Sequence, residues 1–413
     1  AYPPCWDGVV TGKSGWAVTS VLLPDGTVEA GRSAAASNLY EVAGPEVQIL
    51  EQAVRHKYPD GTPERRDCAP AYRTVPTDYI DYVVRQVTPT ARFERAGVSF
   101  NEIIVTAKRD FVFGSRGGYS LSGFAISDFA SRPEGIGDHI TLRLADGRIL
   151  NRVGPLGAKP WHRSGDMDTG CYVAAYPNPL GAGAIYPLAP MRTKTVLTEK
   201  LCATTFGLAL EGVKARKGDV WRIPFVAVAA PTTLEQGNQV FEDIRRTLGI
   251  GCSPGYAIEP RIGTVSDTTG RLLAQAGDSA FAVTLSKTTM PTDLFVQVQG
   301  LNERWTCAKQ LGGEELVPVT VSRGTAYTAL DLNPADVELV VGHPVTCSES
   351  AIRVVTWWSD EGLEVYAHNS GEGPVECDLR TNRAFVGLPV AEHHLRLPPG
   401  ASDVWEISAL RGR

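Results

Sequence analysis

Apolar and polar residues alternate along most of this chain. Short runs with a period of two are bounded by Gly, Pro, Asp or Asn, and Asp25-Gly26 and Asp146-Gly147 are typical hairpin turns. The expected strands are residues 16–23, 79–87, 100–107, 139–144, 171–176, 195–199, 206–210, 220–229, 281–285, 294–299, 317–321, 338–341, 352–357, 364–368 and 404–407. Because strands without intervening helices form sandwiches or barrels, we predict an all-β fold. It consists of a large N-terminal antiparallel β-sandwich followed by one or two smaller β-sandwich modules, with few helices.

Two segments have a helical pattern instead. In residues 45–58, a proline suits the first helical position and apolar residues recur three to four positions apart. In residues 232–248, Thr232 and Glu235 have the spacing of a capping box, and Gly249 follows as a C-terminal cap. We therefore expect two short helices.

The second expected helix is the natural domain boundary. We predict a large β-sandwich domain over residues 1–250, which contains both helices. C-terminal β-sandwich modules follow over residues 251–413, with a subdivision near 345–350. One continuous β-rich body is the alternative.

The eight cysteines indicate an oxidising compartment. Their number is even, and none forms a Cys-x-x-Cys pair or lies beside a histidine at zinc-finger spacing, so structural disulfides are favoured over metal sites. The pairings we consider are Cys171 with Cys202, Cys307 with Cys347 and Cys5 with Cys68. Free thiols in a cytosolic protein are the alternative. The chain begins at Ala1, as a mature protein does after removal of a signal peptide, and it has no N-glycosylation motif. We expect a bacterial protein that is secreted or displayed at the cell surface.

Charge and motifs exclude several function classes. The net charge is −6 and no basic run exceeds a pair of residues, so nucleic acid is not an expected partner. The longest uncharged stretch, residues 169–191, contains four prolines, so no membrane span is expected. No Gly-x-Ser-x-Gly elbow, Walker loop, His-Glu-x-x-His or EF-hand loop occurs, so serine hydrolases, nucleotide-binding proteins and zincins have no local support.

Residues 195–249 resemble part of a known fold family. A Lys217-Gly218-Asp219 turn is followed by the apolar strand at 220–228 and the capped helix. This stretch is similar to the last strands of the galactose-mutarotase-like super-sandwich of many carbohydrate-active enzymes. No catalytic motif of a glycoside hydrolase or polysaccharide lyase matches. The resemblance therefore implies a super-sandwich-like fold and carries over no catalytic residue.

Residues 161–172 are the most suggestive segment for chemistry. We interpret them as a glycine-punctuated loop on a rigid β scaffold, where binding and catalytic residues usually lie. The candidates are a sugar-stacking Trp161, a proton-carrying His162, a substrate-clamping Arg163, and Asp166 and Asp168 as acid, base or calcium ligands. A solvated polar turn is the alternative. Apart from calcium at these carboxylates, no cofactor or metal is expected.

A second loop is expected at residues 127–139. Glu134, Asp138 and His139 lie in it, and its carboxylates could face those of the first loop across a cleft. Two facing carboxylates are suited to glycoside hydrolysis, whereas β-elimination by a lyase needs a base such as His162 or His139.

We therefore expect an exported carbohydrate-active enzyme that cleaves glycosidic bonds of a polysaccharide or oligosaccharide. Its expected catalytic residues are His162, Asp166, Asp168, Asp138 and His139, and its expected substrate-binding residues are Trp161, Arg163 and Glu134. The alternative is a non-catalytic glycan-binding or self-assembling surface protein, because edge strands make assembly easy. A sugar isomerase is a third hypothesis.

Two further segments rank lower. Glu392-His393-His394 resembles a metal-ligand fragment, but adjacent residues on a strand point to opposite faces, so the two imidazoles should not share one ion. The same alternation puts one ring of Trp357-Trp358 in the core and the other outside, where it could serve as a sugar platform.

Overall fold

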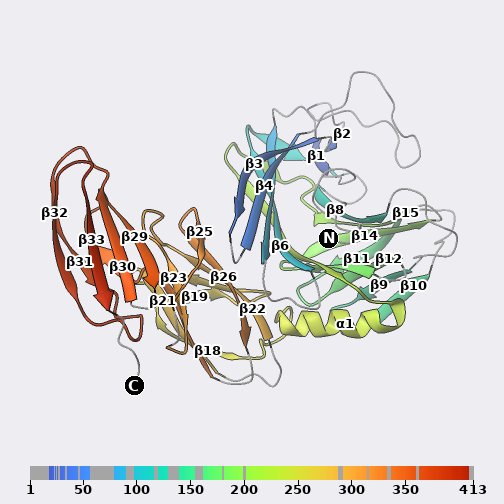
Figure 1. Ribbon diagram of the computed structural model, residues 1–413. Coiled ribbons are helices and arrows are strands. Elements are labelled where there is room, and N and C mark those ends of the chain that lie inside the picture. The colour runs from blue at the N-terminus through green and yellow to red at the C-terminus, as the bar shows by residue number, and fades with distance from the viewer. Residues whose placement is uncertain are drawn as a thin grey trace.

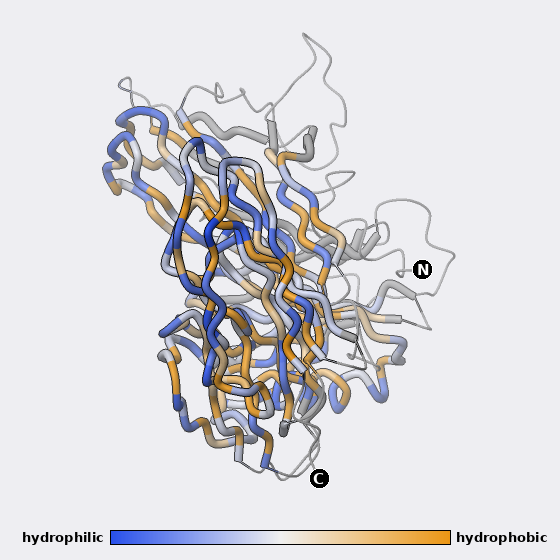
Figure 2. The backbone as a smooth tube through the Cα atoms, turned by 60° about the vertical axis from the view of Figure 1, so that its left-hand side comes forward, coloured by the Kyte–Doolittle hydropathy of each residue, from blue (hydrophilic) through white to orange (hydrophobic). Residues whose placement is uncertain are grey.

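The protein is a row of three antiparallel β-sandwiches, which confirms the predicted all-β fold (Figure 1). A computed structural model describes residues 18–22, 24, 26, 28–32, 35–44, 47–55, 79–89, 97–115, 120–128, 139–153, 161–178, 181–198, 201–286, 292–313, 316–332, 336–359 and 362–408. Orange and blue segments alternate along many of the strands, as the period of two requires (Figure 2). Among the described residues, no helix is both long and apolar enough to cross a membrane.

The N-terminal sandwich consists of sheets A and B. Sheet A has the order β11-β14-β15-β8-β1-β7-β16, with β2 paired to β1, and sheet B has the order β10-β9-β12-β13-β17-β6-β5-β4-β3. Sheet A contains β1 (Val18–Leu22), β2 (Val28–Arg32), β7 (Phe111–Phe113), β8 (Leu121–Asp128), β11 (Trp161–Met167), β14 (Met191–Thr198), β15 (Leu201–Leu208) and β16 (Lys214–Ala215). Sheet B contains β3 (Ala35–Ala43), β4 (Val47–Arg55), β5 (Ile80–Pro89), β6 (Gly97–Ala107), β9 (His139–Arg143), β10 (Ile149–Val153), β12 (Tyr172–Asn178), β13 (Gly181–Pro187) and β17 (Val220–Ala230).

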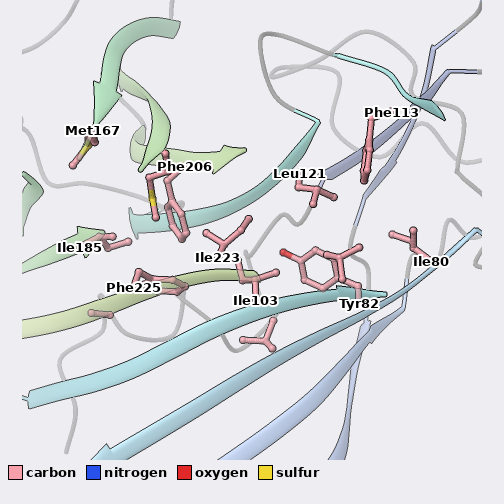
Figure 3. Close-up of a cluster of buried hydrophobic side chains, with 14 of the residues drawn as sticks. Ile80, Tyr82, Ile103, Phe113, Leu121, Met167, Ile185, Phe206, Ile223 and Phe225 are labelled. Carbon is pink, nitrogen blue, oxygen red and sulfur yellow. The ribbon is translucent and has the colours of Figure 1, made fainter. Parts of the chain in front are cut away.

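The first core lies between sheets A and B. Met167 and Phe206 from sheet A pack in one cluster with Ile185 and Phe225 from sheet B (Figure 3). The rings of Phe206 and Phe225 meet edge to face with centroids 4.7 Å apart. Burial of such a cluster from two facing sheets is what stabilises a sandwich.

The expected helix at residues 45–58 is wrong. Residues 47–55 form β4, which pairs with β3 on one side and β5 on the other. Val47, Ile49 and Glu51 are buried while Gln48 is exposed, so burial follows a period of two. The same apolar residues also fit a helical stripe, and pairing with two neighbouring strands decides between the two periods.

The second expected helix is confirmed as α1 (Leu234–Thr247), which covers the outer face of sheet B (Figure 1). Phe241 is buried on that face against Tyr172 and Tyr176. The capping box is not formed, because Thr233 is the N-cap and makes no side-chain cap hydrogen bond. At the other end, Gly249 has φ +65°, as a glycine cap requires.

The middle sandwich consists of sheets C and D around a separate core. Sheet C has the order β18-β21-β27-β23-β24 and sheet D the order β19-β20-β22-β26-β25. The strands of sheet C are β18 (Ala257–Ile262), β21 (Ala280–Ser286), β23 (Ala308–Leu311), β24 (Val317–Pro318) and β27 (Val337–Gly342). Those of sheet D are β19 (Thr264–Asp267), β20 (Leu272–Gln275), β22 (Thr292–Gln299), β25 (Thr320–Ser322) and β26 (Thr325–Leu332). Only β20 and β22 pair in parallel among the described strands.

The C-terminal sandwich consists of two small sheets around a further core. Sheet E has the order β28-β31-β32 and sheet F the order β29-β30-β33. Sheet E contains β28 (Val345–Cys347), β31 (Val375–Thr381) and β32 (Glu392–Leu397), and sheet F contains β29 (Ile352–Ser359), β30 (Gly362–Asn369) and β33 (Ser402–Ser408). Phe385 packs against Ala280 and Ala308 of the middle sandwich and so joins the two units.

Candidate functional site

Residues 161–172, which the sequence predicts to be a loop, are mostly strand. Residues 161–167 form β11, which pairs with β14 along the edge of sheet A. A register shift between Arg163 and Gly165 marks a bulge, which accommodates the serine and glycine of this segment without breaking the pairing. The candidate residues of this segment therefore lie along an extended strand.

The strand separates candidate residues that the sequence places close together. His162 and Asp168 are six positions apart, so the extended backbone holds them at about 20 Å from each other. Trp161, Arg163 and Asp166 occupy other positions along the same strand. His162 and Asp168 therefore lie at opposite ends of this segment and not side by side.

Backbone pairing places His162 and His139 toward the same end of the N-terminal sandwich. β11 runs into the turn at residues 168–171, and β12 leaves that turn in the opposite sheet. His162 lies six positions before the start of this turn. His139 pairs with Tyr176, which lies five positions after the end of the turn. The two histidines thus lie on the two facing sheets, each on a strand that is close in sequence or pairing to this turn. Asp138 and Glu134 lie outside the described residues.

Asp168 belongs to a turn with a structural role. Its side chain is exposed, and its backbone carbonyl accepts a hydrogen bond of 3.0 Å from the Cys171 amide. Gly170, two positions beyond Asp168, approaches the backbone of Gly251 so closely that a Cβ on Gly251 would overlap it. The turn therefore anchors the start of β12 to the segment that follows α1.

Metal ligands do not gather in the described part of the chain. No group of three or more His, Cys, Asp and Glu side chains there could hold a metal ion. As expected, His393 and His394 take different partners: His393 Nε2 lies 2.9 Å from Asp403, and His394 Nδ1 lies 2.8 Å from Asp378. The two imidazoles point to opposite faces of β32, so they cannot share one ion.

No two cysteines with described side chains lie at disulfide bonding distance. The predicted pairing of Cys307 with Cys347 is wrong, because Cys307 is buried in the core of the middle sandwich and Cys347 in that of the C-terminal sandwich. Cys171 is a free thiol in the core between sheets A and B, so its predicted pairing with Cys202 is not formed. Cys5 and Cys68 lie outside the described residues.

The outer face of sheet F carries an exposed aromatic and apolar patch. Trp357 is 66% exposed and Tyr366 is 42% exposed, and Val355 and Val404 are exposed beside them. Tyr366 pairs across the sheet with both Val355 and Val404, which places the three side chains in one row. Trp357 lies in the next row, diagonal to Tyr366, at a Cα separation of about 7–8 Å. We call these four residues the sheet F patch.

Polar groups border the sheet F patch on two sides. On one side, Glu364 lies opposite both Trp357 and Glu406, and the Tyr366 hydroxyl donates a hydrogen bond of 2.6 Å to Glu364. This hydrogen bond to a carboxylate raises the pKa of Tyr366. On the other side, His368 lies opposite Arg353 and Ser402 and contacts the Ser402 hydroxyl at 2.9 Å.

The strand period explains why Trp357 is exposed. Val354, Thr356 and Trp358 face the interior, and Trp358 packs against the core of the C-terminal sandwich. The predicted division of the tryptophan pair into one inner and one outer ring is confirmed. Tyr366 and Val404 were not among the sequence candidates, although both stand at outward positions of predicted strands. Only the strand register brings them beside Trp357.

Sheet E has a very different outer face. Its cross-strand partners are complementary in charge: Glu376 with Arg396, Asp378 with His394 and Arg380 with Glu392. The Arg380 guanidinium lies 2.8 Å from Glu392. Such pairs are typical of a solvated sheet surface. On sheet F, the two carboxylates Glu364 and Glu406 are directly opposite each other instead, which is unfavourable for the sheet itself.

The comparisons with known proteins add no family to this picture. No protein-family model matches the chain, and a search of curated proteins found no significant match.

Proposed function

We propose that this protein binds a glycan on the sheet F patch. The observation that carries the proposal is the exposure of Trp357 and Tyr366 on one flat sheet face. Each face of a sugar ring presents C–H groups with hydroxyls around its rim. A flat indole with polar neighbours matches that chemistry, because the ring covers the apolar face while the neighbours bind hydroxyls.

The border of the patch supplies groups for sugar hydroxyls. Glu364 and Glu406 accept hydrogen bonds from hydroxyls beside Trp357, and Ser402 and His368 can donate or accept on the far side. Two carboxylates next to the indole disfavour an anionic sugar at that position. We therefore propose a neutral glycan chain as the ligand.

Local features of the patch cost stability, which favours a functional explanation. Exposed Trp and Tyr rings lose favourable burial, and the opposed Glu364 and Glu406 repel each other. The outer face of sheet E, in the same sandwich, carries cross-strand pairs of complementary charge instead. A surface that exposes aromatic rings and places like charges opposite each other is typical of a binding site.

The test is affinity electrophoresis and calorimetry of the full chain with soluble neutral and anionic polysaccharides. We expect a neutral polysaccharide to bind, and Trp357→Ala to weaken this binding at least about 10-fold without changing thermal unfolding. The matched control is Val390→Ala, which truncates a 74% exposed residue of the same sandwich outside the patch and should bind like the wild type. Equal affinity of Trp357→Ala and the wild type would contradict the proposal, as would binding of anionic polysaccharides alone.

Cleavage of glycosidic bonds in the N-terminal sandwich is a second candidate function. The backbone positions of His162 on β11 and His139 on β9, in the two sheets of one sandwich, favour it, since histidine is suited to proton transfer near neutral pH. Asp138 and Glu134 precede β9 in the sequence and would supply carboxylates.

Product analysis separates binding from cleavage. Incubation with a polysaccharide panel, followed by reducing-end and ultraviolet assays, distinguishes hydrolysis from β-elimination. If the chain cleaves, His162→Ala and His139→Ala should abolish product formation while Asp168→Ala, at the far end of β11, retains it. Absence of products from every polysaccharide would remove this second function and leave glycan binding.

A further inference from the structure

Cys347 and Cys377 form a buried pair of thiols in the C-terminal sandwich. Their sulfur atoms lie 3.5 Å apart, and the two residues are 30 positions apart in the sequence. Cys347 ends β28 and pairs with Leu379, two positions beyond Cys377 on the neighbouring β31, so the cysteines are diagonal neighbours in sheet E. Both side chains belong to the apolar core of this sandwich.

No other cysteine with a described side chain has such a partner. Cys171 and Cys307 are buried in different cores, and Cys252 is exposed. A disulfide has an S–S length of about 2.05 Å and usually joins residues on neighbouring segments whose Cα atoms are about 5.5–6 Å apart. Diagonal neighbours in a sheet have Cα atoms about 7–8 Å apart, so closing the bond also requires the end of β28 at Cys347 to move toward β31. The sulfurs are already in contact and need to approach by about 1.5 Å.

We infer that Cys347 and Cys377 form a disulfide when the chain meets a disulfide oxidant such as oxidised glutathione. The two S–H bonds break and one S–S bond forms between the strands. Two electrons and two protons pass to the oxidant, whose own S–S bond is reduced to two thiols. This inference is independent of the proposed glycan binding.

The bond would close a loop that contains the hairpin of β29 and β30. That hairpin carries Trp357 and Tyr366, so the covalent link, which joins β28 to β31 within sheet E, encloses the strands that present the sheet F patch. A cross-link of this length stabilises a small domain mainly by restricting its unfolded chain. The C-terminal sandwich buries a small core, and such units are the ones that disulfides most often support.

The chemistry also predicts when the bond forms. Burial, followed by the hydrogen bond with Cys347, raises the pKa of the Cys377 thiol to about 12. Because the thiolate is the attacking species, the folded reduced sandwich should oxidise slowly. Oxidation should be fast while the chain folds, before the core closes.

Peptide mapping of the full chain tests the inference. The protein is unfolded, reduced, refolded with oxidised glutathione, alkylated and digested with trypsin without reduction. Trypsin cleaves after Arg323, Arg353 and Arg380, so the expected product is peptide 324–353 linked to peptide 354–380. Recovery of both peptides only as alkylated, unlinked species, or with each linked to other cysteine peptides, would overturn the inference.

A stability comparison gives a second, independent measurement. Dithiothreitol should lower the thermal unfolding midpoint of the oxidised wild type by several degrees. Cys307→Ala, which truncates a buried thiol that is not disulfide-bonded, should keep this shift, whereas Cys347→Ala should lose most of it. An equal effect of dithiothreitol on the two variants would overturn the inference, and the mapping of the wild type stands even if a variant fails to fold.

Discussion

At the scale of single residues, His343 shows how burial sets a protonation state. It lies between β27 and β28 and is almost fully buried beside Trp305. Its Nε2 accepts a hydrogen bond from the backbone N–H of Asn302, so the ring proton is on Nδ1. Nδ1 lies 3.2 Å from the backbone carbonyl oxygen of Thr306. Both ring nitrogens are thus satisfied only in the neutral form. Burial lowers the pKa of His343 below its ordinary value of 6.5, and the hydrogen bond to Thr306 opposes this shift only in part.

A lowered histidine pKa predicts loss of stability in acid. Below pH 6.5 the unfolded chain protonates His343 while the folded chain does not, so the free energy of unfolding falls as the pH decreases. The slope from this one group is at most about 1.4 kcal/mol per pH unit. The free energy of unfolding, measured in urea between pH 5 and 7.5, should fall with decreasing pH in the wild type. In His343→Gln this dependence on pH should be smaller.

His394 provides a control of opposite sign. Its exposed imidazole is hydrogen-bonded to Asp378, which raises its pKa, so its contribution is fully present below pH 6.5 and is lost as the pH rises through the raised value. His394→Gln should therefore leave the acid-side loss of stability in place. If His343→Gln and the wild type had the same slope, the assignment to His343 would be wrong.

At the scale of elements, α1 is held on sheet B by close packing as well as by the burial of apolar surface. Gly237, in the first half of the helix, is buried directly over Tyr176, and a Cβ at this position would overlap the Tyr176 ring and hydroxyl. Glu242 forms ion pairs with Arg143 of β9 and with Arg245 of the helix itself. The glycine sets the distance between the helix and the sheet.

Gly237→Ala should destabilise the protein even though alanine favours helices. The gain in helix propensity is about 1 kcal/mol, whereas forcing a methyl group into this contact costs about 1–3 kcal/mol. We expect a net loss of up to about 2 kcal/mol in urea unfolding. The exposed Gln239→Ala should change the free energy of unfolding by less than about 0.5 kcal/mol. In a Tyr176→Ala background, Gly237→Ala should become neutral or stabilising. Equal effects in both backgrounds would show that the contact with Tyr176 is not the cause.

The elements also show where sequence patterns are ambiguous. Residues 47–55 satisfy both the helical and the strand period, and only the partners β3 and β5 select the strand. Residues 161–167 look like a loop because of their glycine and serine, but a bulge allows them to pair with β14. In residues 234–247 the helical period has no competing strand pattern, so that prediction was correct.

At the scale of the whole molecule, the sandwiches are joined by aromatic and ionic contacts. Phe295 of β22 stacks on Phe100 of sheet B with ring centroids 4.7 Å apart, and it belongs to the same cluster as α1. Beside this stack, Glu51 lies between Arg85 of β5 and Arg323 of the turn after β25. The interface thus couples the N-terminal and middle sandwiches through both packing and charge.

Phe295→Ala should uncouple the two sandwiches. Truncating a buried phenylalanine costs about 3–5 kcal/mol, and here the cavity falls in the interface. Scanning calorimetry should show separate transitions for the two sandwiches in place of a shared one. The matched control is Phe281→Ala, an equal truncation inside the middle core, which should lower the midpoint of the middle sandwich without removing the interface. A Phe295→Ala profile identical to that of Phe281→Ala would contradict this role.

The hydrophobic periods of the sequence, with its turn signals, were sufficient to determine the all-β class, the positions of most strands, helix α1 and the outward direction of one ring of the Trp357-Trp358 pair. These properties depend on a few neighbouring residues, because the strand and helix periods act locally. Which outward residues share a surface was decided only by the tertiary structure. Trp357 meets Tyr366 and Val404, and Cys347 meets Cys377, through pairings between strands distant in the sequence. Register depends on the packing of both faces of every sheet, and no local pattern contains that information.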